Sequence, residues 1–273
     1  MKRIVLGLEY DGAPWQGWQT QPHGQTVQDR LQSALAQFAQ TPIALHCAGR
    51  TDTGVHAIEQ VVHFDTEVER DCASWVRGVN SFLPPSIALR WASEVALPAH
   101  NDDASEQEFH ARFAARGRTY HYLLVNRPVR SPLLVGKAGW AFRPLAIEPM
   151  RSAAACLIGS HDFSAFRSAQ CQAKTPVKTM YDIQIRQQGE LLIFTLHASA
   201  FLHHMVRNIV GSLVQIGSGK MPADWLQEVL LGRDRAAAAP TFMPDGLYLA
   251  KIDYDPKWQL PQQDGASLAW LFP

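Results

Sequence analysis

The chain has 273 residues, of which 47% are hydrophobic, and its 25 lysines and arginines balance 25 acids. This composition is ordinary for a globular protein of one large or two modest domains. No apolar run is long enough to span a bilayer, and charged residues interrupt the N-terminal segment before a signal-peptide core could form, so we expect a mature cytoplasmic protein with no membrane partner. The four cysteines are scattered without a C-x-x-C pair, which argues against a zinc site.

The zero net charge hides an uneven distribution. Residues 111–137 hold six Lys or Arg and no acid, whereas acids gather in 65–71 and 102–108. If the basic stretches share a face, that face is an anion-binding surface. The alternative is a set of unrelated solvated faces, and charge alone does not decide between them.

The first half of the chain alternates between strand and helix patterns. Lys2–Tyr10 alternates like a strand, and Thr26 caps a segment with apolar residues at helical spacing. The next expected elements are strands at Ile43–Ala48 and Ala57–Phe64, a helix at Ala73–Phe82 and a strand at Ile87–Val95. This β-α-β-β-α-β order is that of the ferredoxin-like unit.

A polar segment, Leu97–Glu108, is expected to be a linker or surface loop, and the same order of elements follows it with one extra helix. The expected elements are strands at Arg112–Asn126, Val177–Arg186, Leu191–Ala198 and Leu247–Tyr254, and helices at Ala146–Leu157, His203–Ile216 and Ala223–Leu231. The sequence therefore predicts an α+β protein of two tandem ferredoxin-like, RRM-like βαββαβ units. We expect domains at 1–105 and 106–273, with a central cleft between them.

The stretch AGRTDTGVHA, residues 48–57, contains Asp52-Thr53-Gly54, a tripeptide that holds a catalytic carboxylate in aspartic proteases. Such proteases need two such loops facing each other, and this chain has one. A second possibility is a single nucleophilic Asp at a strand-to-loop edge beside a cation, here Arg50. A third is an Asp that only hydrogen-bonds its own turn, which the tripeptide alone would favour.

Three further blocks occur with this stretch in an order that resembles the TruA-type tRNA pseudouridine synthases. The blocks are EYDGAPWQGWQTQ (9–21), RTYHYLL (118–124) and FLHHMVRNIVGSL (201–213). The resemblance extends over about residues 1 to 255. It implies a pseudouridine synthase fold and the isomerisation of uridine to pseudouridine at positions 38, 39 and 40 of the tRNA anticodon stem-loop. It also implies a homodimer that needs no cofactor and no metal.

By this resemblance Asp52 is the nucleophile or nucleophilic trigger, and the sequence leaves open whether it attacks C1′, attacks C6 or first helps to remove a sugar proton. Arg207 is its expected ionic partner. The helix expected at His203–Ile216 carries Arg207 together with Val206, Val210 and Leu213, which form a core face, and an unpaired charge among them would be costly. The alternative for Arg207 is solvent or phosphate. Tyr120 is expected to pack on the uracil and take the C5 proton, and the alternative is a plain amphipathic strand.

The resemblance also suggests RNA contacts. Arg50 is expected to fill the gap left by the flipped nucleotide, or else to contact phosphate. Trp18 is expected to be core. The histidine pair lacks the spacing of a metal site and suits packing or RNA contact. The other candidates for RNA contact are Tyr10, Asp11, Gln19, Arg112, Arg118, Lys174, Lys178, His203 and His204.

Two other classes of protein compete with this interpretation. A non-catalytic RNA-binding protein of two RRM-like units would carry an aromatic RNP string, which the sequence lacks. A glycoside hydrolase would need two paired carboxylates, and only Asp52 lies in a credible loop. Two segments depart from the family pattern: the acidic loop 97–108, which we expect to point away from RNA, and the tail 258–273, which runs past the usual end.

Overall fold

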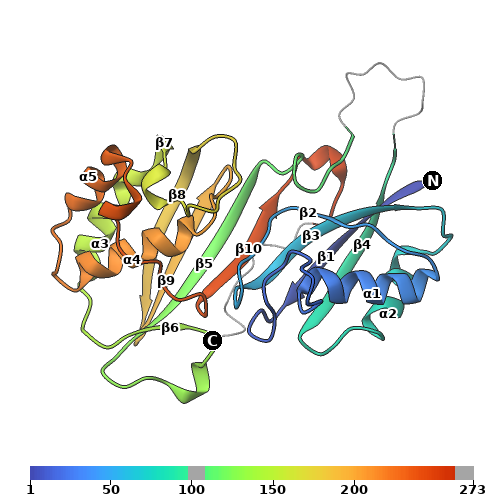
Figure 1. Ribbon diagram of the computed structural model, residues 1–273, viewed down its shortest axis with the longest axis horizontal. Helices are drawn as coiled ribbons and strands as arrows, with labels where there is room; N and C mark the ends of the chain where they lie inside the picture. The colour runs from blue at the N-terminus through green and yellow to red at the C-terminus, as the bar shows by residue number, and fades with distance from the viewer. Residues whose placement is uncertain (98–107, 262–273) are drawn as a thin grey trace. The chain divides into compact units, whose positions relative to one another are not determined.

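The computed structural model describes residues 1–97 and 108–261, so the expectations for the loop 97–108 and most of the tail lie outside the described residues. The chain is of mixed α+β class, as predicted. It divides into two compact units (Figure 1), Met1–Arg116 with the chain from Leu249 onward, and Gly117–Tyr248. No helix in the described ranges is both long and apolar enough to cross a membrane.

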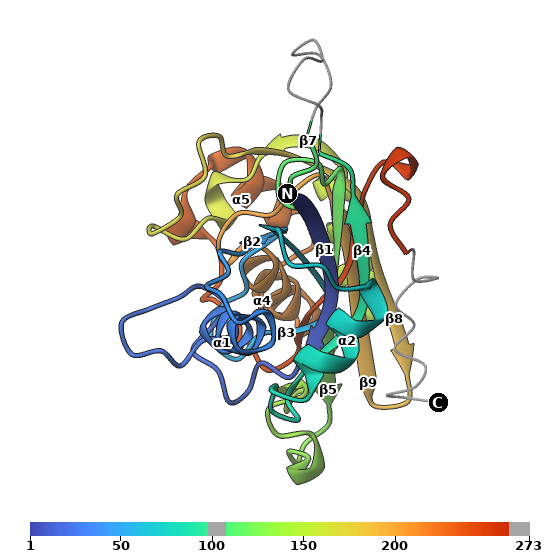
Figure 2. The same ribbon diagram turned by 90° about the vertical axis from the view of Figure 1, so that its right-hand side faces the viewer.

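The first unit contains an antiparallel sheet and two helices. β1 (Lys2–Tyr10) lies between β4 (Ile87–Val95) and β3 (His56–Thr66), and β2 (His46–Cys47) also pairs with β3. β3 lies between β1 and β10 (Leu247–Asp253) in the strand order. The helices are α1 (Val27–Ala39) and α2 (Cys72–Asn80); α2 packs on β4, and α1 packs against α2 (Figure 2).

An aromatic cluster joins the two helices to the sheet of this unit. Trp75 of α2 is fully buried, and the rings of Phe38 from α1 and Phe64 from β3 meet it edge-on at 5.2 and 5.1 Å. Such edge-to-face contacts add roughly 0.5–1.5 kcal/mol beyond burial. Thr26 caps α1 as predicted, because its hydroxyl accepts the N–H of Asp29 at 3.2 Å.

The second unit contains strands β5 (Gly117–Asn126), β9 (Leu191–Ala198), β8 (Val177–Gln188) and β7 (Gly159–Asp162), each antiparallel to the next. β6 (Gly139–Ala141) pairs in parallel with the end of β5, which makes the sheet a mixed one. The helices α3 (Ile147–Ala154), α4 (Met205–Gly217) and α5 (Trp225–Gly232) lie beside the strands of this unit (Figure 1). Short 3-10 turns occur at Pro132–Leu134, Ala155–Leu157, Ser164–Phe166 and Arg235–Ala237, and in the first unit at Pro256–Trp258.

Several expected boundaries were wrong, each for a local reason. Residues 43–47 alternate in burial like a strand, but ladder pairing is confined to His46–Cys47. The strand expected from Arg112 begins at Gly117, because the preceding residues turn, with the Ala114 N–H donating to His110 O at 2.8 Å. β6 and β7 were not predicted, since three or four residues carry no readable alternation. Most of β10, expected to close the second half, groups with the first unit.

Glu59 on β3 is a buried carboxyl group in the first unit. Its side chain is 5% exposed, and burial raises its pKa from the usual 4.5 to about 7, although Lys251 and the Ile252 backbone oppose the shift. The folded state therefore holds a proton that the unfolded chain releases between about pH 4.5 and 7. Stability falls as the pH rises through this window and stays reduced above it.

Replacing Glu59 by Gln removes this penalty. We expect Glu59→Gln to raise the free energy of unfolding by about 3 kcal/mol at about pH 8 and to leave it nearly unchanged at about pH 4.5. Urea unfolding of both proteins at the two pH values checks this. An equal difference at both pH values would contradict the assigned cause.

Candidate active site

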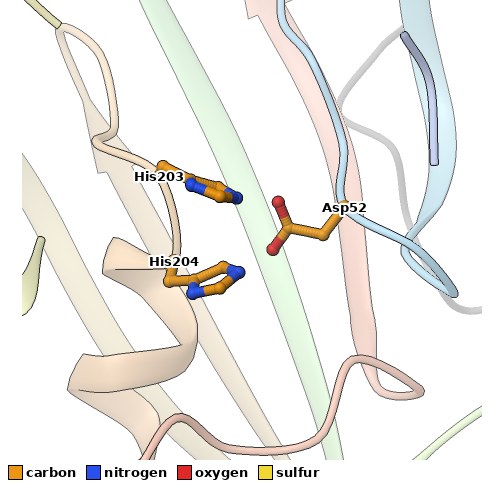
Figure 3. A group of neighbouring side chains, drawn as sticks. All are labelled: Asp52, His203 and His204. Carbon is orange, nitrogen blue, oxygen red and sulfur yellow. The ribbon is translucent and has the colours of Figure 1, made fainter. Parts of the chain in front are cut away.

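Asp52 opens a tight turn between β2 and β3 in the first unit. The N–H of Val55 donates to the Asp52 carbonyl at 3.1 Å, and Gly54 has φ +78°, a left-handed conformation that glycine adopts without strain. The Asp52 side chain is half-exposed, and Figure 3 shows its carboxylate pointing away from the loop backbone. The turn therefore presents a carboxylate on a backbone of fixed shape.

The end of β1 and the segment that follows it hold this turn in place. The Tyr10 hydroxyl and the Thr51 hydroxyl form a buried hydrogen bond of 2.8 Å. The backbone N–H of Trp18 donates to the Thr51 carbonyl at 3.0 Å. Trp18 is buried, as predicted, and its ring lies 5.9 Å from that of Tyr10. These contacts fix Thr51, the residue before Asp52, so Tyr10 and Trp18 hold the loop in position.

Two glycines of the same segment permit its close approach to the turn. A Cβ on Gly12 would lie 2.0 Å from the Val55 carbonyl oxygen, which no packing adjustment allows. Gly17 has φ +82°, and a Cβ there would lie 3.1 Å from the Thr51 carbonyl oxygen. The glycines in the YDG and QGW strings thus have a physical role beside the catalytic loop, which sequence analysis did not assign.

The other candidates near this turn differ in exposure. Arg50 and Gln19 are exposed, as an RNA contact requires. Asp11 accepts the N–H of Ala13 at 3.1 Å and lies 3.0 Å from Nδ1 of His56. Asp11 is therefore engaged in the local structure of the segment, and its contact with RNA stays a prediction.

In the second unit, Tyr120 and Tyr122 share one face of β5. Tyr120 is 9% exposed, and its ring meets that of Phe201 edge-on at 5.0 Å. Tyr122 is fully buried, its hydroxyl donates to the Met243 carbonyl at 2.9 Å, and burial raises its pKa. Tyr122 is thus a packing residue, while Tyr120 is the less enclosed of the two.

Arg207 lies on α4, whose residues Val206, Val210 and Leu213 are buried, as expected for a core face. The Arg207 side chain is half-buried, and its Nε donates to the Phe242 carbonyl at 2.8 Å. This bond sets the direction of the guanidinium. Asp52 belongs to the first unit and Arg207 to the second, so their pairing stays a prediction.

A buried amide next to Arg207 holds the segment that contains Phe242. Asn208 Nδ2 donates to the Phe166 carbonyl at 2.8 Å, and its Oδ1 accepts from Arg235 at 3.0 Å and from Thr241 at 2.8 Å. Because Phe242 follows Thr241, this network positions the carbonyl that binds Arg207. Sequence analysis passed over Asn208, although it follows Arg207 directly in the quoted block.

His203 and His204 lie in the turn that precedes α4, not in the helix as expected. His204 has φ +65°, and the helix begins at Met205. Their rings lie side by side with centroids 4.0 Å apart (Figure 3). Taken by itself, neither unit gathers three His, Cys, Asp or Glu ligand atoms in its described residues.

The remaining basic candidates differ in how firmly they are held. Lys178 Nζ donates to the carbonyls of Thr175 and Val177 at 2.8 and 2.9 Å, and burial, with the charge of Arg167, lowers its pKa. Arg118 donates to the Ser199 carbonyl at 2.9 Å. Lys174 and Arg112 are exposed. Exposure suits contact with phosphate, which stays a prediction for all four.

Comparison with known proteins defines the class of protein to which this site belongs. A family model described as tRNA pseudouridine synthase matches residues 8–103 and 153–255, and the chain belongs to that family. It is 68% identical over 269 residues to "tRNA pseudouridine synthase A" of Janthinobacterium sp. (strain Marseille), covering 98% of each chain. It is 68% identical over 270 residues to the protein of the same name from Herminiimonas arsenicoxydans, covering 98% of this chain and 96% of that one. The predicted family is thereby confirmed.

A solved structure, "Crystal Structure of a Cbf5-Nop10-Gar1 Complex", aligns with 86% of this chain and 60% of that chain at 11% identity and a TM-score of 0.33. So low a score does not establish a shared fold.

The hydrogen bond beneath the Asp52 turn can be tested by a double-mutant cycle. Tyr10→Phe and Thr51→Val each remove one partner of the 2.8 Å bond, so the two changes together should cost about 1 kcal/mol less than the sum of the single changes. Urea unfolding gives the four free energies. Tyr254→Phe, whose hydroxyl donates instead to the Ala111 carbonyl, serves as a control and should add to Thr51→Val without coupling. Additive effects of Tyr10→Phe and Thr51→Val would contradict the clamp.

Proposed function

We propose that this chain isomerises uridine to pseudouridine in the anticodon stem-loop of tRNA, at positions 38, 39 and 40. Family membership supports the reaction class. The observation that carries the chemistry is the Asp52 turn, in which a half-exposed carboxylate stands on a backbone held by Tyr10, Trp18 and two glycines. A nucleophile that must meet one atom of a flipped nucleotide needs this fixed placement.

The reaction is an isomerisation, so the substrate and the product contain the same atoms. The bond between C1′ and N1 breaks, a bond between C1′ and C5 forms, the proton leaves C5, and N1 gains a proton. Asp52 either attacks C1′, displacing N1 and later being displaced by C5, or adds at C6 and is eliminated after C5 has joined C1′, so its carboxylate is regenerated in both cases. Each step is acid–base or nucleophilic chemistry within reach of protein side chains, and the proposal invokes no cofactor.

Arg207 and Tyr120 complete the proposed catalytic set. Arg207 pairs with the Asp52 carboxylate, a role supported by its half-buried position and by the Phe242 carbonyl that directs its guanidinium. Tyr120 packs on the uracil and takes the C5 proton directly or through water. This role is supported by the position of Tyr120 on the same face of β5 as Tyr122, where Tyr120 is the more exposed of the two.

The architecture proposed for this function is a tandem of two ferredoxin-like βαββαβ units that form a pseudouridine synthase fold. The strand order β4-β1-β3-β2 in the first unit supports it, as does the order β5-β9-β8 in the second. The domain bounds 1–105 and 106–273 stay predictions, with the Asp52 loop in one domain and Tyr120 and Arg207 in the other. A homodimer and a cytoplasmic location are also part of the proposal.

The first test is chemical. Wild type should convert uridine in an unmodified tRNA transcript, and Asp52→Asn should lower the single-turnover rate by at least about a thousandfold, because the amide is no nucleophile. Pseudouridine is quantified by mass spectrometry of nucleosides, and tRNA affinity is measured in parallel. Asp224→Asn, an exposed acid of the second unit, is the matched control and should remain active.

Two outcomes would overturn the proposal. Activity of Asp52→Asn close to that of wild type would remove Asp52 from the chemistry. Tight, salt-sensitive tRNA binding by a wild type that makes no pseudouridine would favour the non-catalytic RNA-binding protein.

A second test concerns the exposed arginine beside the nucleophile. The affinity for tRNA should fall linearly with salt on a log–log plot, and Arg50→Gln should weaken binding and lower the slope by about one, since one phosphate contact is lost. Arg70→Gln, another exposed arginine of the first unit, should leave the slope unchanged. Filter binding at several salt concentrations checks both. Equal slopes for all three proteins would remove Arg50 from the RNA contact.

A further inference from the structure

We propose that four side chains of the first unit, His46, His110, Arg112 and Phe113, form a stacking surface for an unpaired nucleotide of the substrate RNA. We call this set the stacking patch. The inference rests on the proposed function and extends it. The sequence led us to expect only a contact between Arg112 and the RNA backbone, whereas the patch assigns contacts with a base to all four residues.

The stacking patch is an exposed row of flat groups. Phe113 is 77% exposed, more than any other Phe, Tyr or Trp in the described part of the chain. The His110 ring lies 4.4 Å from it at a tilt of 34°, and the His46 ring lies 5.1 Å from His110. The Arg112 guanidinium stands 5.8 Å from the centre of the Phe113 ring. Aromatic faces interleaved with arginine are the means by which proteins hold single-stranded bases.

A buried histidine supports the patch from below. His63 of β3 is buried, and its ring lies 5.1 Å from His46 and 4.7 Å from His110. Its Nδ1 accepts the N–H of Ala111 at 3.1 Å, while Nδ1 of His110 accepts the N–H of Arg112 at 3.1 Å. Burial, with the charge of Arg3, lowers the pKa of His63 to about 3, so this ring is neutral at physiological pH. The turn that presents Phe113 is therefore tied to β3 by the bond from Ala111 to His63.

The local charge favours an anionic partner such as RNA over a cationic or purely apolar one. Two acids act on the histidines here, Asp65 on His63 and Glu108 on His110, and both pair with Arg3, at 2.7 and 2.5 Å. Arg112 and Arg50 both act on the thiol of Cys47 in β2, where their charges oppose the rise of its pKa caused by burial. Both arginines therefore lie close to β2, so the patch and Arg50 are on the same part of the first unit, near the Asp52 turn.

The test compares two exposed phenylalanines that carry the same kind of arginine contact. Phe142 in the second unit is 55% exposed, and Arg143 stands 5.4 Å from its ring centre. Phe113→Ala should weaken binding of an unmodified anticodon stem-loop RNA about tenfold, since one stacked base is lost, and Phe113→Trp should bind within about twofold of wild type. Phe142→Ala should bind like wild type. Urea unfolding of each variant shows that it is folded.

A set of RNAs with single abasic sites identifies the stacked nucleotide. Wild type should lose about tenfold in affinity at one abasic position, and Phe113→Ala should lose nothing further there, because the base and the ring are partners in one contact. Arg112→Gln is a second variant of the patch and should lower the salt slope by about one, which Phe113→Ala should not do.

The outcomes separate this inference from the proposed function. Pseudouridine formation by wild type, combined with unchanged RNA binding by Phe113→Ala, would overturn the stacking patch alone. Equal losses for Phe113→Ala and Phe142→Ala, or additive losses at every abasic position, would also overturn it. A wild type that makes no pseudouridine would overturn the proposed function, whereas a loss confined to Phe113→Ala would still support the patch as an RNA contact.

Discussion

The site depends on the attachment of the Asp52 turn to the end of β1 and to the segment that follows it. Thr51 is bound twice, through its hydroxyl by Tyr10 and through its carbonyl by the Trp18 N–H, and both partners are buried. Gly12 and Gly17 are needed because the segment touches the turn with its backbone. A half-exposed carboxylate on a free loop would sample many positions. One that follows a doubly bound threonine has little freedom, and this preorganisation is what a nucleophile requires.

Much of the first unit could be predicted from sequence because its elements are long and regular. The strand at Lys2–Tyr10, the cap at Thr26 and the burial of Trp18 follow from local pattern, and the structure confirms all three, although β1 is buried on both faces and its burial does not alternate. Asp52 could be located because a turn residue beside Gly54 and Arg50 occurs within a string that the family shares. The family itself was predicted from four blocks and is confirmed by comparison with known proteins.

The rest could not be predicted because it depends on contacts between distant parts of the chain. The carbonyl of Phe242 that holds Arg207 is 35 residues away in sequence, and Asn208 binds partners from two further segments. The short strands β6 and β7 exist only because longer strands offer them an edge. The stacking patch combines β2 with the turn before β5. From the sequence, Arg112 was expected only to contact the RNA backbone. The base contact that we propose for it depends on the rings that the fold brings beside it.

The central claim is that Asp52 becomes covalently bonded to the substrate. The most direct measurement is mass spectrometry of the peptide that contains Asp52 after reaction with a stem-loop RNA bearing 5-fluorouridine at the target position. Fluorine replaces the hydrogen that must leave C5, so the last step is blocked and the adduct should persist. We predict an RNA adduct on the Asp52 carboxylate, and none with Asp52→Asn. An adduct on another residue, or none with an enzyme that converts ordinary uridine, would contradict the account.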